Sequence, residues 1–194
     1  LAAIGSGTVL QLVDISDLAD VGNLSAADFQ FKVGNSNAPS SWAPYTGEVE
    51  ARVRPGEGAS GSDRITLVFP DGSITKQWLQ ITVLATDQTG LVSEDVFYFG
   101  NAIGEAGNSP EQAFVNATDR VLTRYNPHFF MAPAGIEDAY DFNRDTKVNA
   151  TDQIIARHNQ TYFLNALTLI TPPTPPLPAP SSLTASAPSD TQIN

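Results

Sequence analysis

Oxygen-bearing side chains spaced two residues apart form the stretch of this chain best suited to chemistry. At positions 1, 3, 5, 9 and 12 of a twelve-residue segment stand Asp141, Asn143, Asp145, Asn149 and Asp152. Lys147, at position 7, can add its backbone carbonyl. A hard cation such as Ca²⁺ takes about six to eight oxygen ligands, and such alternation points every second side chain towards one ion. The segment is therefore a candidate calcium loop.

An internal repeat contains this loop. The sequence Val-Asn-Ala-Thr-Asp at 115–119 recurs unchanged at 148–152, an offset of 33 residues. At the same offset the identical pairs are Arg124 and Arg157, Asn126 and Asn159, and Phe130 and Phe163. Helical periodicity follows both copies, so each is expected to be a loop that leads into a helix. An Asp at the start of such a helix is also favoured by the helix dipole.

The first copy lacks the ladder of alternating acids and amides that precedes the second. An insertion before residue 115 is the simplest explanation, and the Gly-rich segment 100–108 then supplies the oxygen ligands. The expected ligands of this second candidate metal site are Asn101, Glu105, Asn108, Asn116 and Asp119. The sequence predicts one Ca²⁺ and leaves a second open.

The duplicated loop and helix resemble the type I dockerin, and the resemblance covers residues 96–170. That family closes its loop with Asp at position 12, as Asp152 does here, whereas an ordinary EF-hand uses Glu. Thr146 departs from the pattern, because Gly normally makes the tight turn at position 6. A β-branched residue there is expected to adopt a strained backbone conformation.

The resemblance implies a small all-α, calcium-binding module with two similar faces. In dockerins the partner, a cohesin, contacts loop positions 10 and 11 and residues farther along the same helix. Carried over, the partner-binding residues are Ala150, Thr151, Arg157, His158, Ala117, Thr118, Arg124 and Tyr125. The near-duplicate faces imply a pseudo-twofold arrangement that can bind a partner in two orientations.

Strands are predicted before the repeat, because apolar residues alternate with polar ones in several short runs up to Asp95. Turn-forming residues separate the runs, and Pro70-Asp71-Gly72-Ser73 is expected to join two strands as a hairpin. The best fit for residues 1–95 is an antiparallel, immunoglobulin-like β-sandwich. The predicted fold class is thus multidomain, a β-sandwich followed by the all-α module.

Proline dominates the C-terminal part of the chain. Residues 171–180 are expected to form a stiff linker. Residues 181–194 resemble the first strand of a fibronectin type III domain, so we expect this chain to be part of a longer protein.

Composition excludes several function classes. The net charge of −11 repels nucleic acid, and no apolar run is long enough for membrane insertion. The absence of cysteine removes disulfides, thiolate metal sites and cysteine nucleophiles. No pair of carboxylates is arranged for acid–base catalysis, so we expect no enzymatic activity.

The function predicted from the sequence is protein–protein docking in a larger extracellular, cell-surface protein, with calcium folding the helical part. The resemblance implies a cohesin-like or other surface protein as partner and a link to polysaccharide degradation. One alternative is a structural repeat unit of an extracellular filament or surface layer, in which the tail binds neighbouring copies. Another is a carbohydrate-binding accessory that uses Trp42, Tyr45 and Trp78.

Overall fold

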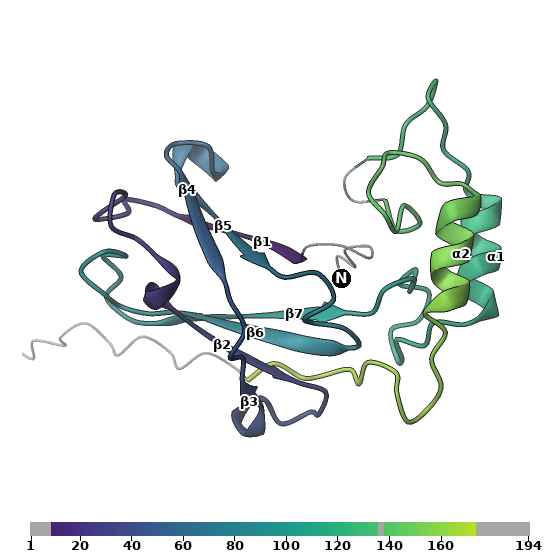
Figure 1. The fold of residues 1–194 in the computed structure, drawn as a ribbon, viewed down its shortest axis with the longest axis horizontal. Coiled ribbons are helices and arrows are strands. Elements are labelled where there is room, and N and C mark those ends of the chain that lie inside the picture. Colours follow the sequence, from purple (N-terminus) through teal and green to yellow (C-terminus); the bar gives the residue numbers. More distant parts are fainter. Residues whose placement is uncertain (1–8, 136–137, 174–194) are drawn as a thin grey trace, which may run out of the picture.

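Two antiparallel β-sheets form most of the molecule. The computed structural model describes residues 9–135 and 138–173 (Figure 1). One sheet has the strand order β1 (Val9–Ile15), β5 (Asp63–Phe69) and β4 (Glu50–Arg54). The other has the order β3 (Ala43–Pro44), β2 (Phe29–Gly34), β6 (Gln77–Val83) and β7 (Asp95–Asn101). Short 3₁₀ turns at Ala26–Asp28, Pro39–Ser41 and Ala59–Gly61 connect strands.

Alternating apolar residues build the core between the sheets, as the period-two pattern predicts. Ile65, Leu67 and Phe69 of β5 are fully buried. They belong to one apolar cluster with Leu79 and its neighbours two and four residues on in β6. Because each such side chain contributes about 1.5–3 kcal/mol when fully buried, this cluster dominates the stability of the two-sheet part.

The expected multidomain fold with a separate all-α module is wrong. The structure is mostly β, and its described part contains only two α-helices, α1 (Ala117–Tyr125) and α2 (Ala150–His158), of nine residues each. Residues 95–101, placed at the boundary of the predicted helical region, form β7 and pair along their whole length with β6. The rest of the segment up to residue 170 is mainly loops and turns.

The chain after α2 returns to the sheets, which is the physical reason why the helices form no separate module. Leu167 is buried in one apolar cluster with Trp42 and Trp78. The Trp78 indole Nε1 donates a hydrogen bond to the Thr168 carbonyl at 2.7 Å. Gly100 permits this approach, since a Cβ there would lie 2.8 Å from a methyl carbon of Leu167.

The turn at Pro70-Asp71-Gly72-Ser73 is not a hairpin. It connects β5 to β6, and these strands belong to different sheets. Two antiparallel sheets packed face to face require such a crossing, and period-two patterning alone does not distinguish it from a hairpin.

Two further sequence predictions concern the C-terminal segment and membrane insertion. Residues 174–194, with most of the proline-rich linker and the fibronectin-like segment, lie outside the described residues. Neither of the α-helices in the described ranges is long and apolar enough to cross a membrane.

Candidate functional site: a helix pair and two carboxylate loops

The two copies of the repeat begin their helices in the same way. Asn116 and Asn149 are the N-caps, with φ of −145° and −146°. The side-chain oxygen of each accepts a hydrogen bond at 2.7 Å from the amide two residues on. Asp119 and Asp152, at the third helical position, accept in return from the N-cap amides at 2.7 and 2.9 Å. Both helices therefore carry a capping box that satisfies otherwise unpaired N–H groups.

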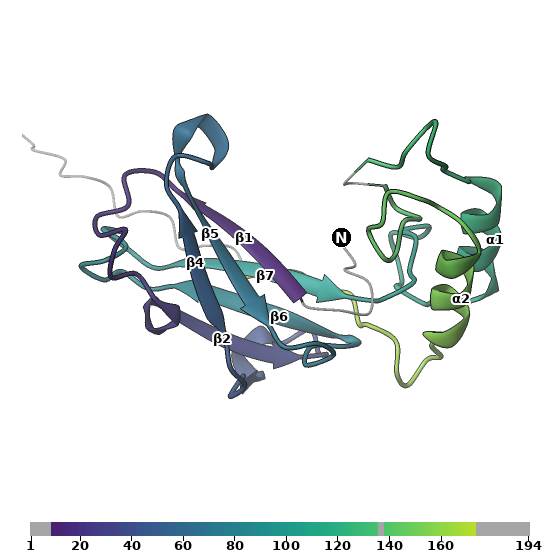
Figure 2. The ribbon, with the colours of Figure 1, turned by 45° about the horizontal axis from the view of Figure 1, so that its top comes forward.

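The end of each copy pairs with the start of the other. The His128 amide donates to the Val148 carbonyl at 3.2 Å, and the Thr161 amide donates to the Val115 carbonyl at 2.9 Å. These two bonds are equivalent at the offset of 33 residues, and they place the end of each helix beside the start of the other. The helices are thus antiparallel and related by a pseudo-twofold axis. They lie side by side at one end of the molecule in both views (Figures 1 and 2).

The candidate calcium loop brings three of its predicted ligands together. Asp141 is buried, and its carboxylate accepts from the amides of Asp145 at 3.2 Å and Thr146 at 2.8 Å. The Asn143 amide nitrogen donates to the Asp145 carboxylate at 3.1 Å. Positions 1, 3 and 5 therefore converge on one side of a tight loop, as an ion-binding loop requires.

The other predicted ligands of this loop do not point to its centre, and two of them cap the start of α2 instead. Asp152 is completely buried, and its second carboxylate oxygen accepts from the Phe142 amide at 2.9 Å. Asn149 uses its side-chain oxygen as the N-cap of α2, and Lys147 is exposed. In this geometry Asp152 ties the start of the loop to the start of the helix.

Thr146 adopts the left-handed conformation expected from its place at position 6, with φ of +69°. Such a conformation is strained for a β-branched residue. We expect Thr146→Gly to raise the free energy of unfolding by about 0.5–1 kcal/mol, because relief of strain exceeds the flexibility that Gly adds to the unfolded chain.

Urea unfolding followed by far-UV circular dichroism measures this effect. Thr151→Gly is the matched control, since Thr151 lies in the first turn of α2 and the same change there should cost up to about 1 kcal/mol. Destabilisation by Thr146→Gly would show that the residue is not strained.

The first copy has an equivalent pair of carboxylates. Asp119 is fully buried and accepts from the Ala106 amide at 3.0 Å, as Asp152 accepts from Phe142. Glu105, which precedes Ala106, is therefore the counterpart of Asp141. The spacing between Glu105 and Asp119 is three residues longer than between their counterparts, which agrees with the expected insertion. Asn108 joins this centre, donating to Asp119 at 3.1 Å.

One carboxylate oxygen of Glu105 is buried without a hydrogen-bond partner. Glu105 is 9% exposed, its Oε2 accepts from the Gly107 amide at 2.8 Å, and its Oε1 has no partner. Burial raises the pKa of Glu105, and the neighbouring Asp119 carboxylate adds to the increase. Burial also raises the pKa of Asp152. Both centres therefore bury negative charge at a free-energy cost.

Two further predicted ligands of the first copy lie elsewhere. Asn101 is at the end of β7, where its Nδ2 donates to the Ile74 carbonyl at 2.5 Å inside the two-sheet part. Asn116 is the N-cap of α1. Of the five residues expected at this centre, the structure thus joins Glu105, Asn108 and Asp119.

Metal binding at the two loops would have to use carboxylate oxygens together with amide or backbone oxygens. In the described part of the chain, no group of three or more His, Asp or Glu side chains is close enough to hold a metal ion. Calcium also accepts amide and backbone carbonyl oxygens. The donor sets to be considered are therefore Asp141, Asn143 and Asp145 in one loop and Glu105, Asn108 and Asp119 in the other.

The predicted partner-binding residues all lie on exposed parts of the helix pair. Ala117, Thr118, Arg124 and Tyr125 of α1 are exposed, as are Ala150, Thr151, Arg157 and His158 of α2. Val121 and Ile154 are also exposed, although their helical spacing suggests core positions. Val121 and Ile154 are equivalent positions of the repeat, so the sequence could have indicated that they belong to the same exposed face as the predicted partner-binding residues.

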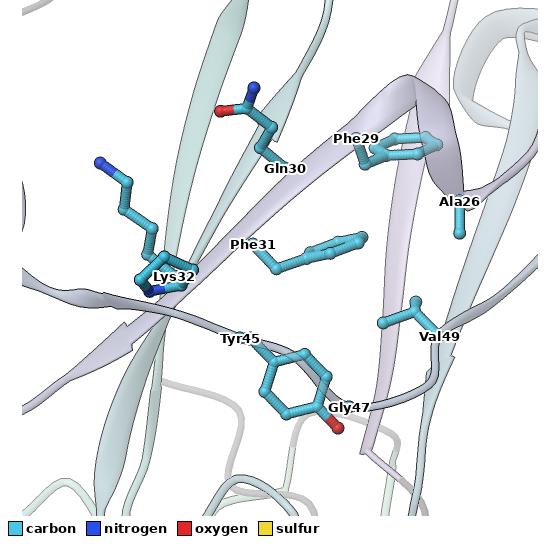
Figure 3. A pocket seen from close by; sticks show the side chains of 9 residues that line it. Ala26, Phe29, Gln30, Phe31, Lys32, Tyr45, Gly47 and Val49 are labelled. Carbon is cyan, nitrogen blue, oxygen red and sulfur yellow. The ribbon is translucent and has the colours of Figure 1, made fainter.

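Away from the helix pair, a hollow lies at the open edge of the two sheets. It has a volume of about 480 Å³ and is lined by Phe29, Phe31, Tyr45 and Val49, among others. Figure 3 shows Phe29 and Phe31 on one side of β2 and Gln30 and Lys32 on the other. The hollow is lined mainly by apolar and aromatic residues, and its lining includes no carboxylate.

The alternative sugar platform is not formed, because two of its three aromatic residues are buried. Trp42 and Trp78 are 5% and 7% exposed and pack in the cluster with Leu167. Stacking of a sugar needs an accessible ring face, which neither indole presents.

Comparison with known proteins gives no match: no protein-family model, no curated protein and no solved structure is similar to this chain.

Proposed function

We propose that this chain is a non-catalytic, calcium-stabilised docking segment of a larger extracellular protein, with its partner bound on the exposed side of α1 and α2. The observation that carries the calcium part is the equivalent pairs of buried carboxylates, Glu105 with Asp119 and Asp141 with Asp152. None of these four forms an ion pair with a described Lys or Arg. A bound cation would compensate this buried charge and would occupy the unpartnered Glu105 oxygen.

The small core of the helix pair also supports a stabilising ion. Its apolar cluster has four buried members among the described residues, Ala106, Val115, Phe142 and Ala156, and Val148 and Ala134 are buried nearby in the chain. Helices of nine residues are marginal in water without such packing. Ion binding to the folded loops would add the free energy that so few side chains do not supply.

Calcium titration tests the proposal. We expect Ca²⁺ added to the chelated protein to increase helicity and to raise the free energy of unfolding by about 2.7 kcal/mol at a hundredfold excess over the dissociation constant. Far-UV circular dichroism and thermal unfolding of the whole chain measure both effects.

Two variants assign the ions to their centres. Asp145→Asn should weaken the site at the second loop, and Glu105→Gln should weaken the site at the first. Asp87→Asn, an exposed change outside both loops, is the control. An unfolding curve that is identical in Ca²⁺ and in EDTA would refute the calcium part of the proposal.

A further inference from the structure

A groove runs between the exposed sides of the two helices. It has a volume of about 310 Å³. Its lining includes Arg120, Val121 and Arg124 from α1 and Gln153, Ile154 and Arg157 from α2. Because the helices are antiparallel, Arg124 and Arg157 lie towards opposite ends of the groove.

The repeat places the same chemistry on both walls. At the offset of 33 residues, Val121 corresponds to Ile154 and Arg124 to Arg157. Val121 is 42% exposed and Ile154 is 51% exposed, so the middle of the groove is apolar and accessible. Arginine is enriched at protein–protein interfaces, and the buried centre of an interface is more apolar than its rim.

The charge of the groove is opposite to that of the chain. Arg120, Arg124 and Arg157 are three of only ten basic residues in a chain of net charge −11. None of the three forms an ion pair with another described residue. In the two-sheet part, by contrast, the arginines of β4 and β5 are paired with Glu50, Glu57 and Asp14.

We propose that the groove docks an acidic segment of a partner protein, in which two carboxylates flank an apolar residue. Each carboxylate would receive a forked hydrogen bond from a guanidinium at one end of the groove, and the apolar residue would pack on Val121 and Ile154. The groove walls are aliphatic, whereas a polysaccharide would stack on aromatic rings. This inference rests on the proposed docking function and adds the chemistry of the partner.

NMR titration of the ¹⁵N-labelled full chain in Ca²⁺ tests it. The probe is a synthetic peptide with Glu-Leu-Leu-Glu at its centre, and the control peptide has Lys in place of Glu. We expect shifts confined to the groove residues, with weaker binding as salt is added. The double variant Arg124→Glu/Arg157→Glu should weaken binding at least about tenfold. Arg52→Glu/Arg54→Glu, with the same change of charge in β4, should leave it unchanged.

Three results would overturn the inference. These are no binding of the acidic peptide, shifts outside the groove, or binding of heparin that depends on the groove arginines while the peptide does not bind. The last would assign the groove to an anionic polysaccharide. Spectra of the same samples in EDTA distinguish the calcium proposal from the peptide-docking proposal. Helices that persist without Ca²⁺ would refute the calcium role. Binding of the peptide would then be judged separately, from its own titration.

Discussion

Asp152→Ala is expected to lower the free energy of unfolding by about 3–5 kcal/mol and to abolish the helical signal of α2. The carboxylate is fully buried and accepts hydrogen bonds from the Phe142 and Asn149 amides, both at 2.9 Å. Its removal leaves these donors unsatisfied in the interior, at about 1–3 kcal/mol each, and removes half of the capping box. Because small proteins are stable by only about 5–15 kcal/mol, the loop and helix should unfold together.

Urea unfolding in EDTA measures the structural effect without a contribution from calcium. Asp152→Asn keeps one acceptor oxygen and should lose less stability than the alanine variant. Asp87→Ala is the control, since Asp87 is exposed, and it should change stability by less than about 0.5 kcal/mol. A midpoint for Asp152→Ala equal to that of the wild type would contradict the role assigned to this carboxylate.

Trp78→Ala is expected to cost about 3–5 kcal/mol and to detach the segment after α2 from the sheets. The indole packs in the cluster with Trp42 and Leu167 and donates to the Thr168 carbonyl. Two amide side chains complete this attachment, since Asn35 and Asn37 accept from the amides of Thr168 and Thr171 at 2.7 Å. The alanine variant should therefore leave the sheets folded and release the returning segment.

Hydrogen exchange separates these two parts of the molecule. Amides of residues 166–171 should exchange much faster in Trp78→Ala, whereas those of β5 should keep their protection. Trp78→Phe keeps an aromatic ring but loses the indole hydrogen bond and part of the packed ring, so it should cost less than the alanine variant, about 1–2 kcal/mol. Unchanged exchange in residues 166–171 would show that Trp78 does not hold this segment.

The strands were the most predictable part of the fold, and β7 shows where prediction failed. Its sequence, Asp95-Val-Phe-Tyr-Phe-Gly-Asn101, is rich in β-branched and aromatic residues and indicates a strand. The boundary drawn from the repeat nevertheless assigned it to the helical region. The attachment through Leu167 was also unpredicted, because no local pattern indicates which distant indole a leucine will contact.

The helical spacing of apolar residues also gave a wrong expectation about which residues are buried, for a different reason. Val121 and Ile154 have core-like spacing, yet the helix positions that are buried carry smaller residues such as Thr123 and Ala156. Ala156 lies against Gly104, where an added Cβ would be 2.8 Å from the Ala156 Cα, and the larger aliphatic groups remain on the outer face. At the carboxylate centres, residue type predicted Glu105 and Asp119, but the inserted residues hid the correspondence between Glu105 and Asp141.

The bonds that join His128 to Val148 and Thr161 to Val115 make the two copies mutually dependent. Each copy supplies the backbone partner for the end of the other, so unfolding of one copy would leave these N–H and C=O groups of the other without their partners. Because both copies stand in one chain, these bonds form without association of a second molecule. The copies differ in the loop before the helix, which is longer in the first copy and carries Glu105 in place of an aspartate.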